Sequence, residues 1–151
     1  MYLAKNNPEK IGRCITLASK YYRDEMTSAK EIKKLDPIII QQKIPAFADQ
    51  LRRRHVPQDW EIVLKKTAEL LGNLAKSNAL QLSDYATINI PVLLLIGDRD
   101  NMITLEETLA VFDQLPNAEM GVLPATAHPI EQVDTSALAF LINKFLKKAT
   151  N

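Results

Sequence analysis

The sequence predicts an α/β protein with about three parallel strands, flanking helices and a helical insertion. Residues 11–18 and 91–97 are short apolar runs rich in Ile, Val and Leu, bounded by charged or turn residues. Such runs are typical of strands buried on both faces of a parallel sheet. Residues 118–123 are a third, weaker strand candidate, and from residue 88 to residue 148 strand and helix patterns alternate. This alternation favours a layered architecture.

Residues 1–7, at the start of the chain, have helical composition but no capping side chain, and they precede Pro8. A helix without a cap at its start is either the end of a longer helix or an ordinary frayed terminus, and both interpretations remain open.

The middle of the chain is helical in pattern and contains no convincing strand. Pro37 and Pro45 interrupt residues 38–51, since proline ends or bends a helix. Apolar residues then trace one face of a longer helix: Trp60, Val63, Leu64, Thr67, Leu70, Leu71 and Leu74. We therefore expect residues 1–24 and 86–151 to form the sheet portion, with residues 25–85 inserted as a helical domain.

Two helices are expected after the second strand. Thr104 and Glu107 match a T-x-x-E capping box, in which each side chain bonds the other residue's backbone N–H. Leu105, Leu109 and Phe112 then recur on one face of that helix. In the last helix Asp134 or Thr135 can cap the start, and a buried stripe is expected at Leu138, Leu141, Ile142 and Phe145.

Charge and cysteine content limit the classes of function that the chain can have. With 19 basic and 18 acidic residues and a formal net charge of +1, the chain offers no electrostatic basis for binding nucleic acid or an anionic membrane. The basic run at residues 52–55 is interpreted as a solvated helix end. The single cysteine, Cys14, cannot form an internal disulfide, and no signal peptide or bilayer-spanning run is recognised. We expect a buried structural thiol and a cytoplasmic protein.

Glycine is scarce, and its positions exclude several motifs. The chain contains only Gly12, Gly72, Gly97 and Gly121. No dinucleotide-binding fingerprint, phosphate-binding P-loop or G-x-S-x-G nucleophile elbow can be written from glycines so far apart. No cofactor is expected.

Candidate catalytic residues follow two of the predicted strands. Asp98 and Asp100 come directly after residues 91–97, and His128 follows residues 118–123. Residues just beyond the carboxyl ends of parallel strands meet at one edge of the sheet. Asp100 and His128 could therefore form a pair in which the carboxylate orients the imidazole and stabilises it when it takes up a proton. Structural roles, such as helix capping by the aspartate, are the alternative.

The strand I-P-V-L-L-L-I-G-D-R-D at residues 90–100, a helix, a short strand ending in Leu123, and then His128 with a final amphipathic helix resemble the C-terminal half of an α/β-hydrolase. The resemblance implies that Asp100 is the catalytic acid, that His128 is the general base, and that residues 25–85 are the cap. It also extends to residues 2–18, which look like the helix after the nucleophile elbow and the strand that follows it.

The resemblance further implies that the nucleophilic serine and the oxyanion-hole loop lie before Met1. The substrate would be an ester, amide or similar small apolar molecule, with Phe47 and Trp60 of the cap as candidate substrate-binding residues. The isolated chain is then expected to be inactive and to associate with itself or with the missing N-terminal half.

Two alternatives come from other functional classes. A partial sheet leaves edges open, so the chain could be a non-catalytic interaction or dimerisation domain with a hydrolase-like fold. Metal binding by Asp98, Asp100 and His128 is the weaker alternative, since no fourth ligand is evident and no ligand pair stands at helical spacing.

Overall fold

The computed structural model describes residues 1–148, and the chain divides into two compact units. The sheet unit consists of Met1–Tyr22 and the chain from Leu80 onward, and the helical unit is Arg23–Ala79. The boundaries that the sequence predicts at 24/25 and 85/86 lie at 22/23 and 79/80 in the structure.

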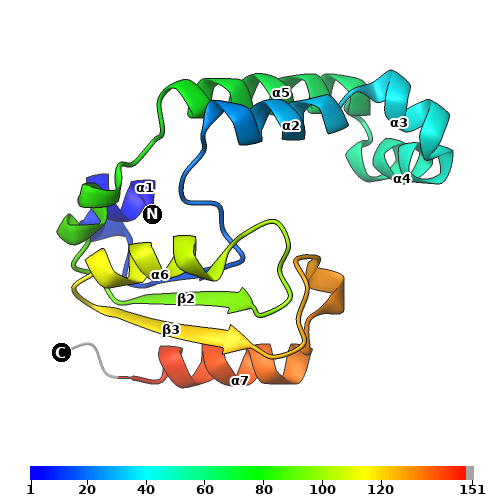
Figure 1. Cartoon of the computed structure of the whole chain (residues 1–151). Coiled ribbons are helices and arrows are strands. Elements are labelled where there is room, and N and C mark those ends of the chain that lie inside the picture. The colour runs from blue at the N-terminus through cyan, green and yellow to red at the C-terminus, as the bar shows by residue number, and fades with distance from the viewer. Residues whose placement is uncertain (149–151) are drawn as a thin grey trace. The chain divides into compact units, whose positions relative to one another are not determined.

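The sheet unit has parallel strands in the order β1-β2-β3, with helices between and after them (Figure 1). Cys14 of β1 pairs with Val92 of β2, and Val92 pairs with Ala118 of β3, so all three strands begin at the same level of the sheet. The elements of this unit are α1 (Tyr2–Asn6), η1 (Pro8–Lys10), β1 (Cys14–Leu17), η2 (Leu82–Thr87), β2 (Val92–Gly97), α6 (Leu105–Gln114), β3 (Ala118–Leu123), η3 (Ile130–Gln132) and α7 (Thr135–Leu146). The predicted α/β class with parallel strands is confirmed.

Strand β2 is the centre of the core, and all six of its residues are buried. Val92 and Leu94 face one side, where they pack in a cluster with residues of α1, η2 and α6. Leu93 and Leu95 face the other side, where they pack against Phe145 of α7. Alternate residues of one strand therefore join two separate clusters, and burial on both faces is confirmed for this strand.

Strand β1 is shorter and more exposed than the sequence predicts. Only Cys14–Leu17 of the expected residues 11–18 form the strand, and each of the four is half-buried. Within residues 1–148, β1 pairs with β2 alone, so one of its edges carries no neighbouring strand. The Cys14 thiol, which the sequence predicts to be buried, is therefore only half-buried, and its sulfur lies 3.9 Å from that of Met1.

Helix α6 turns a different face to the sheet from the one that the leucines mark. Thr108 and Val111 are buried, whereas Leu105 and Leu109 are 39% and 47% exposed. The buried Thr108 hydroxyl donates to the Thr104 carbonyl, so its burial leaves no polar group unsatisfied. Helix α7 follows its prediction more closely: Asp134 caps it, and Leu138, Leu141 and Ile142 pack around buried Phe145.

The helical unit contains α2 (Glu25–Lys34), α3 (Pro37–Lys43), α4 (Pro45–His55) and α5 (Trp60–Lys76). Pro37 and Pro45 occupy the first turns of α3 and α4, where a missing N–H costs nothing. The core of the unit is apolar: Ile40, Ala48, Leu51, Trp60 and Leu64. Among the helices of residues 1–148, none combines the length and apolarity needed to cross a bilayer.

Candidate active site

The loop after β2 holds Asp100 in a fixed position. Its Oδ1 accepts hydrogen bonds from the N–H groups of Met102 and Ile103 at 2.8 and 2.9 Å. Its Oδ2 lies 2.9 Å from Nδ1 of His128. The side chain is only 1% exposed, so the carboxylate is buried with three hydrogen-bond donors around it.

These contacts keep Asp100 ionised. Burial by itself raises the pKa of a carboxyl group. The hydrogen bonds from Ile103 and Met102, and then the hydrogen bond and charge of His128, outweigh it, so the pKa of Asp100 lies below its ordinary value. A carboxylate at neutral pH therefore faces the imidazole.

The loop after β3 carries His128 and is attached to the end of β2 at several points. The N–H of Asp98 donates to the Leu123 carbonyl at 3.1 Å, and the N–H of Arg99 donates to the Thr126 carbonyl at 3.0 Å. In return, the Asp98 carboxylate accepts from the N–H of Thr126 at 3.2 Å. These bonds connect the two loops and bring His128 to Asp100.

Gly97 allows this close approach. A Cβ atom at this position would lie 2.1 Å from the carbonyl oxygen of Thr126 and 2.8 Å from its carbonyl carbon. Both atoms are backbone, so no side-chain rotation could relieve the contact. Only glycine fits at the end of β2 while the loop with Thr126 and His128 stays where it is.

The arrangement is suited to proton transfer. With Nδ1 donating to Asp100, the imidazole presents Nε2 as a basic nitrogen. The His128 side chain is 29% exposed, and a small hollow next to it is lined by Leu17, Ala18, Gly97, residues 126–130 and Val133. A buried carboxylate behind an accessible imidazole can orient the ring and stabilise its protonated form.

The other two predicted site residues, Phe47 and Trp60, belong to the helical unit, the second compact unit of the chain. Trp60 is 4% exposed and packs in the core of that unit, and the Cζ atom of Arg52 lies 5.8 Å from the centroid of its ring. Phe47 is 40% exposed. Of the two, Phe47 presents the larger surface to a ligand.

The metal alternative finds no support in the described chain. Asp98 bonds Thr126, and Asp100 bonds His128. In residues 1–148 no three His, Cys, Asp or Glu side chains gather into a group that could hold a metal ion.

Sequence reasoning missed two contributors to this edge of the sheet. Thr126 is 4% exposed, and its hydroxyl donates to the Pro124 carbonyl at 2.9 Å, which stiffens the loop before His128. Asp98 was named among the residues that follow the strand and as a metal candidate, but its hydrogen bond to the N–H of Thr126 was not predicted. A polar residue two positions before the histidine and an aspartate directly after Gly97 were the available signals.

No family model and no curated protein matches the sequence. Among solved structures, the chain is similar to 2-hydroxy-6-oxo-6-phenylhexa-2,4-dienoate hydrolase from Rhodococcus sp. strain RHA1, with 15% identity and a TM-score of 0.66 over 97% of this chain and 59% of that one.

Two further structures are similar to the chain. An alpha/beta hydrolase enzyme from a Medee basin deep-sea metagenome library is 16% identical, with a TM-score of 0.63 over 98% of this chain and 60% of that one. A thermophilic esterase from Thermogutta terrifontis is 15% identical, with a TM-score of 0.62 over 97% and 61%.

These similarities establish the fold. Nearly the whole chain superposes, but it spans only about three fifths of the length of each of these structures. The chain therefore has a partial α/β-hydrolase fold, as the sequence predicts.

Proposed function

We propose that the chain is the C-terminal portion of an α/β-hydrolase and contributes the acid Asp100 and the base His128 of a Ser-Asp-His triad. The observation that carries the proposal is the 2.9 Å hydrogen bond from His128 Nδ1 to a carboxylate that is 1% exposed. The fold supports it, because both residues follow neighbouring parallel strands at the edge where α/β proteins bind ligands.

The reaction proposed is hydrolysis of an ester, amide or similar small apolar substrate. His128 Nε2 takes the hydroxyl proton of the serine as the serine oxygen bonds to the substrate carbonyl carbon. Collapse of the tetrahedral intermediate breaks the bond to the leaving group, which receives that proton from His128. A water molecule then attacks the acyl-enzyme with His128 again acting as base, so the acid is released and the serine is regenerated.

The serine in this proposal comes from outside the 151 residues. No G-x-S-x-G can be written in the sequence, so the isolated chain is expected to be inactive. The helical unit is proposed as the cap, with Phe47 and Trp60 as candidate substrate contacts. We further propose that the edge of β1 that carries no strand within residues 1–148 pairs with the N-terminal half.

The test begins with the coding DNA in frame before Met1. A G-x-S-x-G followed within a few residues by the present sequence is the expected result. The extended protein should then hydrolyse p-nitrophenyl butyrate, and His128→Ala should abolish the activity. Robust hydrolysis by the 151 residues alone that is lost in His128→Ala would contradict a missing nucleophile.

The second candidate is a non-catalytic interaction domain. Exposed apolar side chains on two helices of the sheet unit favour it, with Leu109 of α6 47% exposed and Phe140 of α7 66% exposed. Both ideas allow the 151 residues to be inactive and to self-associate, so the coding DNA upstream of Met1 distinguishes them, and sedimentation adds the oligomeric state. A stable dimer, and no G-x-S-x-G upstream, would favour the interaction domain.

A further inference from the structure

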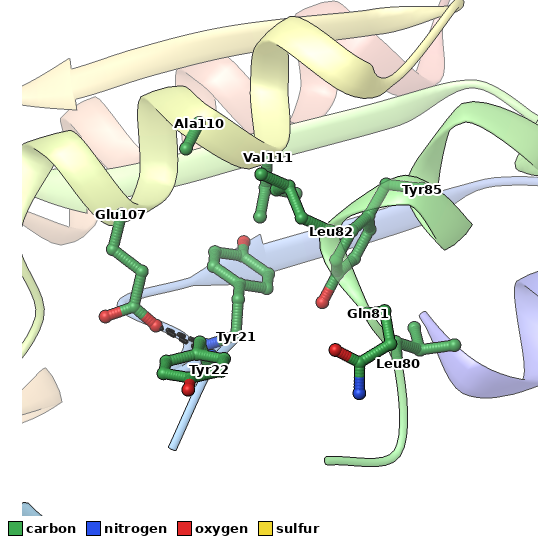
Figure 2. A pocket seen from close by; sticks show the side chains of 9 residues that line it. All are labelled: Tyr21, Tyr22, Leu80, Gln81, Leu82, Tyr85, Glu107, Ala110 and Val111. Carbon is green, nitrogen blue, oxygen red and sulfur yellow. Dashed lines mark hydrogen bonds between the residues drawn. The ribbon is translucent and has the colours of Figure 1, made fainter. Parts of the chain in front are cut away.

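The sheet unit contains a second cavity, and neither Asp100 nor His128 is among its lining residues. It has a volume of about 440 Å³ and is formed by α6, η2 and the segment that follows β1 (Figure 2). This volume falls in the range of small-molecule sites. Its lining is mostly apolar or aromatic: Tyr21, Tyr22, Leu80, Gln81, Leu82, Tyr85, Glu107, Ala110 and Val111.

The Glu107 carboxylate fixes part of the cavity lining, and both of its oxygens accept hydrogen bonds from the segment after β1. Its Oε1 accepts from the N–H groups of Tyr21 and Tyr22 at 2.7 and 3.0 Å. Its Oε2 accepts from Nζ of Lys20 at 2.8 Å. The predicted capping box is therefore only half formed: the Thr104 hydroxyl does accept from the N–H of Glu107, but the Glu107 side chain bonds a segment more than 80 residues earlier in the chain.

The rings of Tyr21 and of Tyr85, which belongs to η2, also line the cavity. The rings of Tyr21 and Tyr85 meet edge to face, with centroids 6.0 Å apart and planes at 88°. The Tyr21 hydroxyl is paired with the Thr16 hydroxyl at 2.6 Å, and η2 is held to α1 by an ion pair between Lys5 and Asp84 at 2.6 Å. Packed rings, paired polar groups and a tethered helix give a cavity that is formed before any ligand arrives.

Tyr85 brings a buried hydroxyl to the lining of the cavity. It is only 3% exposed, and its hydroxyl makes no hydrogen bond to another lining residue, pointing instead into the space between Tyr21 and Gln81 (Figure 2). Burial raises the pKa of Tyr85 to about 12, so the hydroxyl stays protonated at neutral pH and can donate. The Glu107 charge is matched by Lys20, which leaves no unpaired charge on the wall to attract an ion.

We propose that this cavity binds a small, neutral, mostly apolar molecule that carries a hydrogen-bond acceptor, such as a carbonyl oxygen, for the Tyr85 hydroxyl. The apolar walls supply the affinity by removing apolar surface from water. The Tyr85 hydroxyl supplies the selectivity, because a ligand that displaces water from the cavity leaves this donor without a partner unless the ligand carries an acceptor. The site shares no lining residue with the Asp100–His128 pair, so binding does not require catalysis.

The test uses two probes of the same shape, acetophenone and α-methylstyrene, which differ in having C=O or C=CH₂. Each is titrated into the 151-residue protein, and the methyl resonances of Leu80, Leu82 and Val111 are followed by NMR. We expect both probes to shift these resonances in a saturable way. If neither probe shifts them, or if the shifts lie elsewhere in the chain, the proposal is overturned.

Two variants and one control sharpen the test. Tyr85→Phe should weaken acetophenone binding about fivefold, the effect of losing one hydrogen bond, and should change α-methylstyrene binding less than twofold. Equal losses for the two probes would overturn the role assigned to the hydroxyl.

Ala110→Phe should fill the cavity and prevent both probes from binding. The control is Ala139→Phe, which adds the same bulk to an exposed position on α7. A melting curve for each variant reports whether it is folded. Undiminished binding by a folded Ala110→Phe variant would overturn the assignment of the cavity.

Discussion

Two carboxylates near the start of α6 make nearly the same set of contacts and serve different purposes. Asp100 accepts two backbone N–H groups with one oxygen and the His128 ring with the other. Glu107 likewise accepts two backbone N–H groups with one oxygen and the Lys20 ammonium with the other. The pattern of bonds around a carboxylate therefore does not reveal what it does.

The partner makes the difference. An imidazole held through Nδ1 still has Nε2 with which to take a proton, whereas an ammonium has three donors and no acceptor. The His128 side chain is also 29% exposed, against 17% for Lys20. The Asp100 region can therefore take part in proton transfer, and the Glu107 region acts as a structural tie beside a cavity.

The largest expected effect is on catalysis in the extended protein described under Proposed function. Asp100→Asn should lower kcat for p-nitrophenyl butyrate by about 10⁴-fold, because the amide no longer fixes the imidazole tautomer or stabilises its charge. Glu107→Gln should lower it less than about tenfold. Comparable losses in steady-state assays of the two variants would contradict the different roles of the two regions.

The next effect concerns how the loops of the Asp100 region are held. Gly97→Ala should destabilise the protein by about 3 kcal/mol, since the added methyl meets the backbone of Thr126. Gly12→Ala is the matched control, with nothing within 4 Å of its Cβ, and should change stability by no more than about 0.5 kcal/mol. Urea denaturation followed by circular dichroism measures both. Equal stabilities would mean that the loop yields without cost.

A smaller effect is expected for the structural tie. Glu107→Ala removes the acceptor of the Tyr21 and Tyr22 N–H groups and should cost about 2 kcal/mol of unfolding free energy. Thr104→Ala removes only the helix cap and should cost about 1 kcal/mol. If Thr104→Ala proved the more damaging of the two in urea denaturation, Glu107 would be acting mainly as a residue of the helix start.

The smallest expected effect is the dependence of the Asp100 contribution on pH. The pKa of Asp100 is lower in the folded protein than its ordinary value of 3.8. Its contribution to stability is therefore complete above that ordinary value and is lost as the pH falls through the lower, folded pKa. The stability difference between the native protein and Asp100→Asn should narrow between pH 5 and pH 2. A difference that stays constant in urea denaturation across this range would contradict the lowered pKa.

Much of the fold can be predicted from local sequence because local physics dictates it. The apolar run of β2 favours burial, a proline within a helix is tolerated only in the first turn, where Pro37 and Pro45 lie, and Asp134 caps the helix that follows it. The sequence also predicts that Asp100 and His128 follow adjacent strands, which limits them to one edge of the sheet.

What could not be predicted depends on contacts between distant segments. The leucines of α6 mark a plausible buried face, yet Thr108 and Val111 face the sheet instead. A T-x-x-E pattern predicts a glutamate that turns back on its own helix, yet Glu107 reaches the segment after β1. The spacing of residues along the chain predicts neither the buried face of α6 nor the bonding partner of Glu107, because both depend on segments that lie far away in the sequence.

The sequence by itself determined the α/β class, the parallel strands and their alternation with helices, the positions of several helix starts and the residues available for acid–base chemistry. Only the tertiary structure decided that β1 is a short, half-buried strand, that the β2 and β3 loops meet over Gly97, and that a cavity forms beside Tyr85. The reason is physical: backbone preferences and apolar periodicity act over a few residues. Close approach, hydrogen bonding between loops and the shape of a cavity depend on atoms brought together from far apart in the chain.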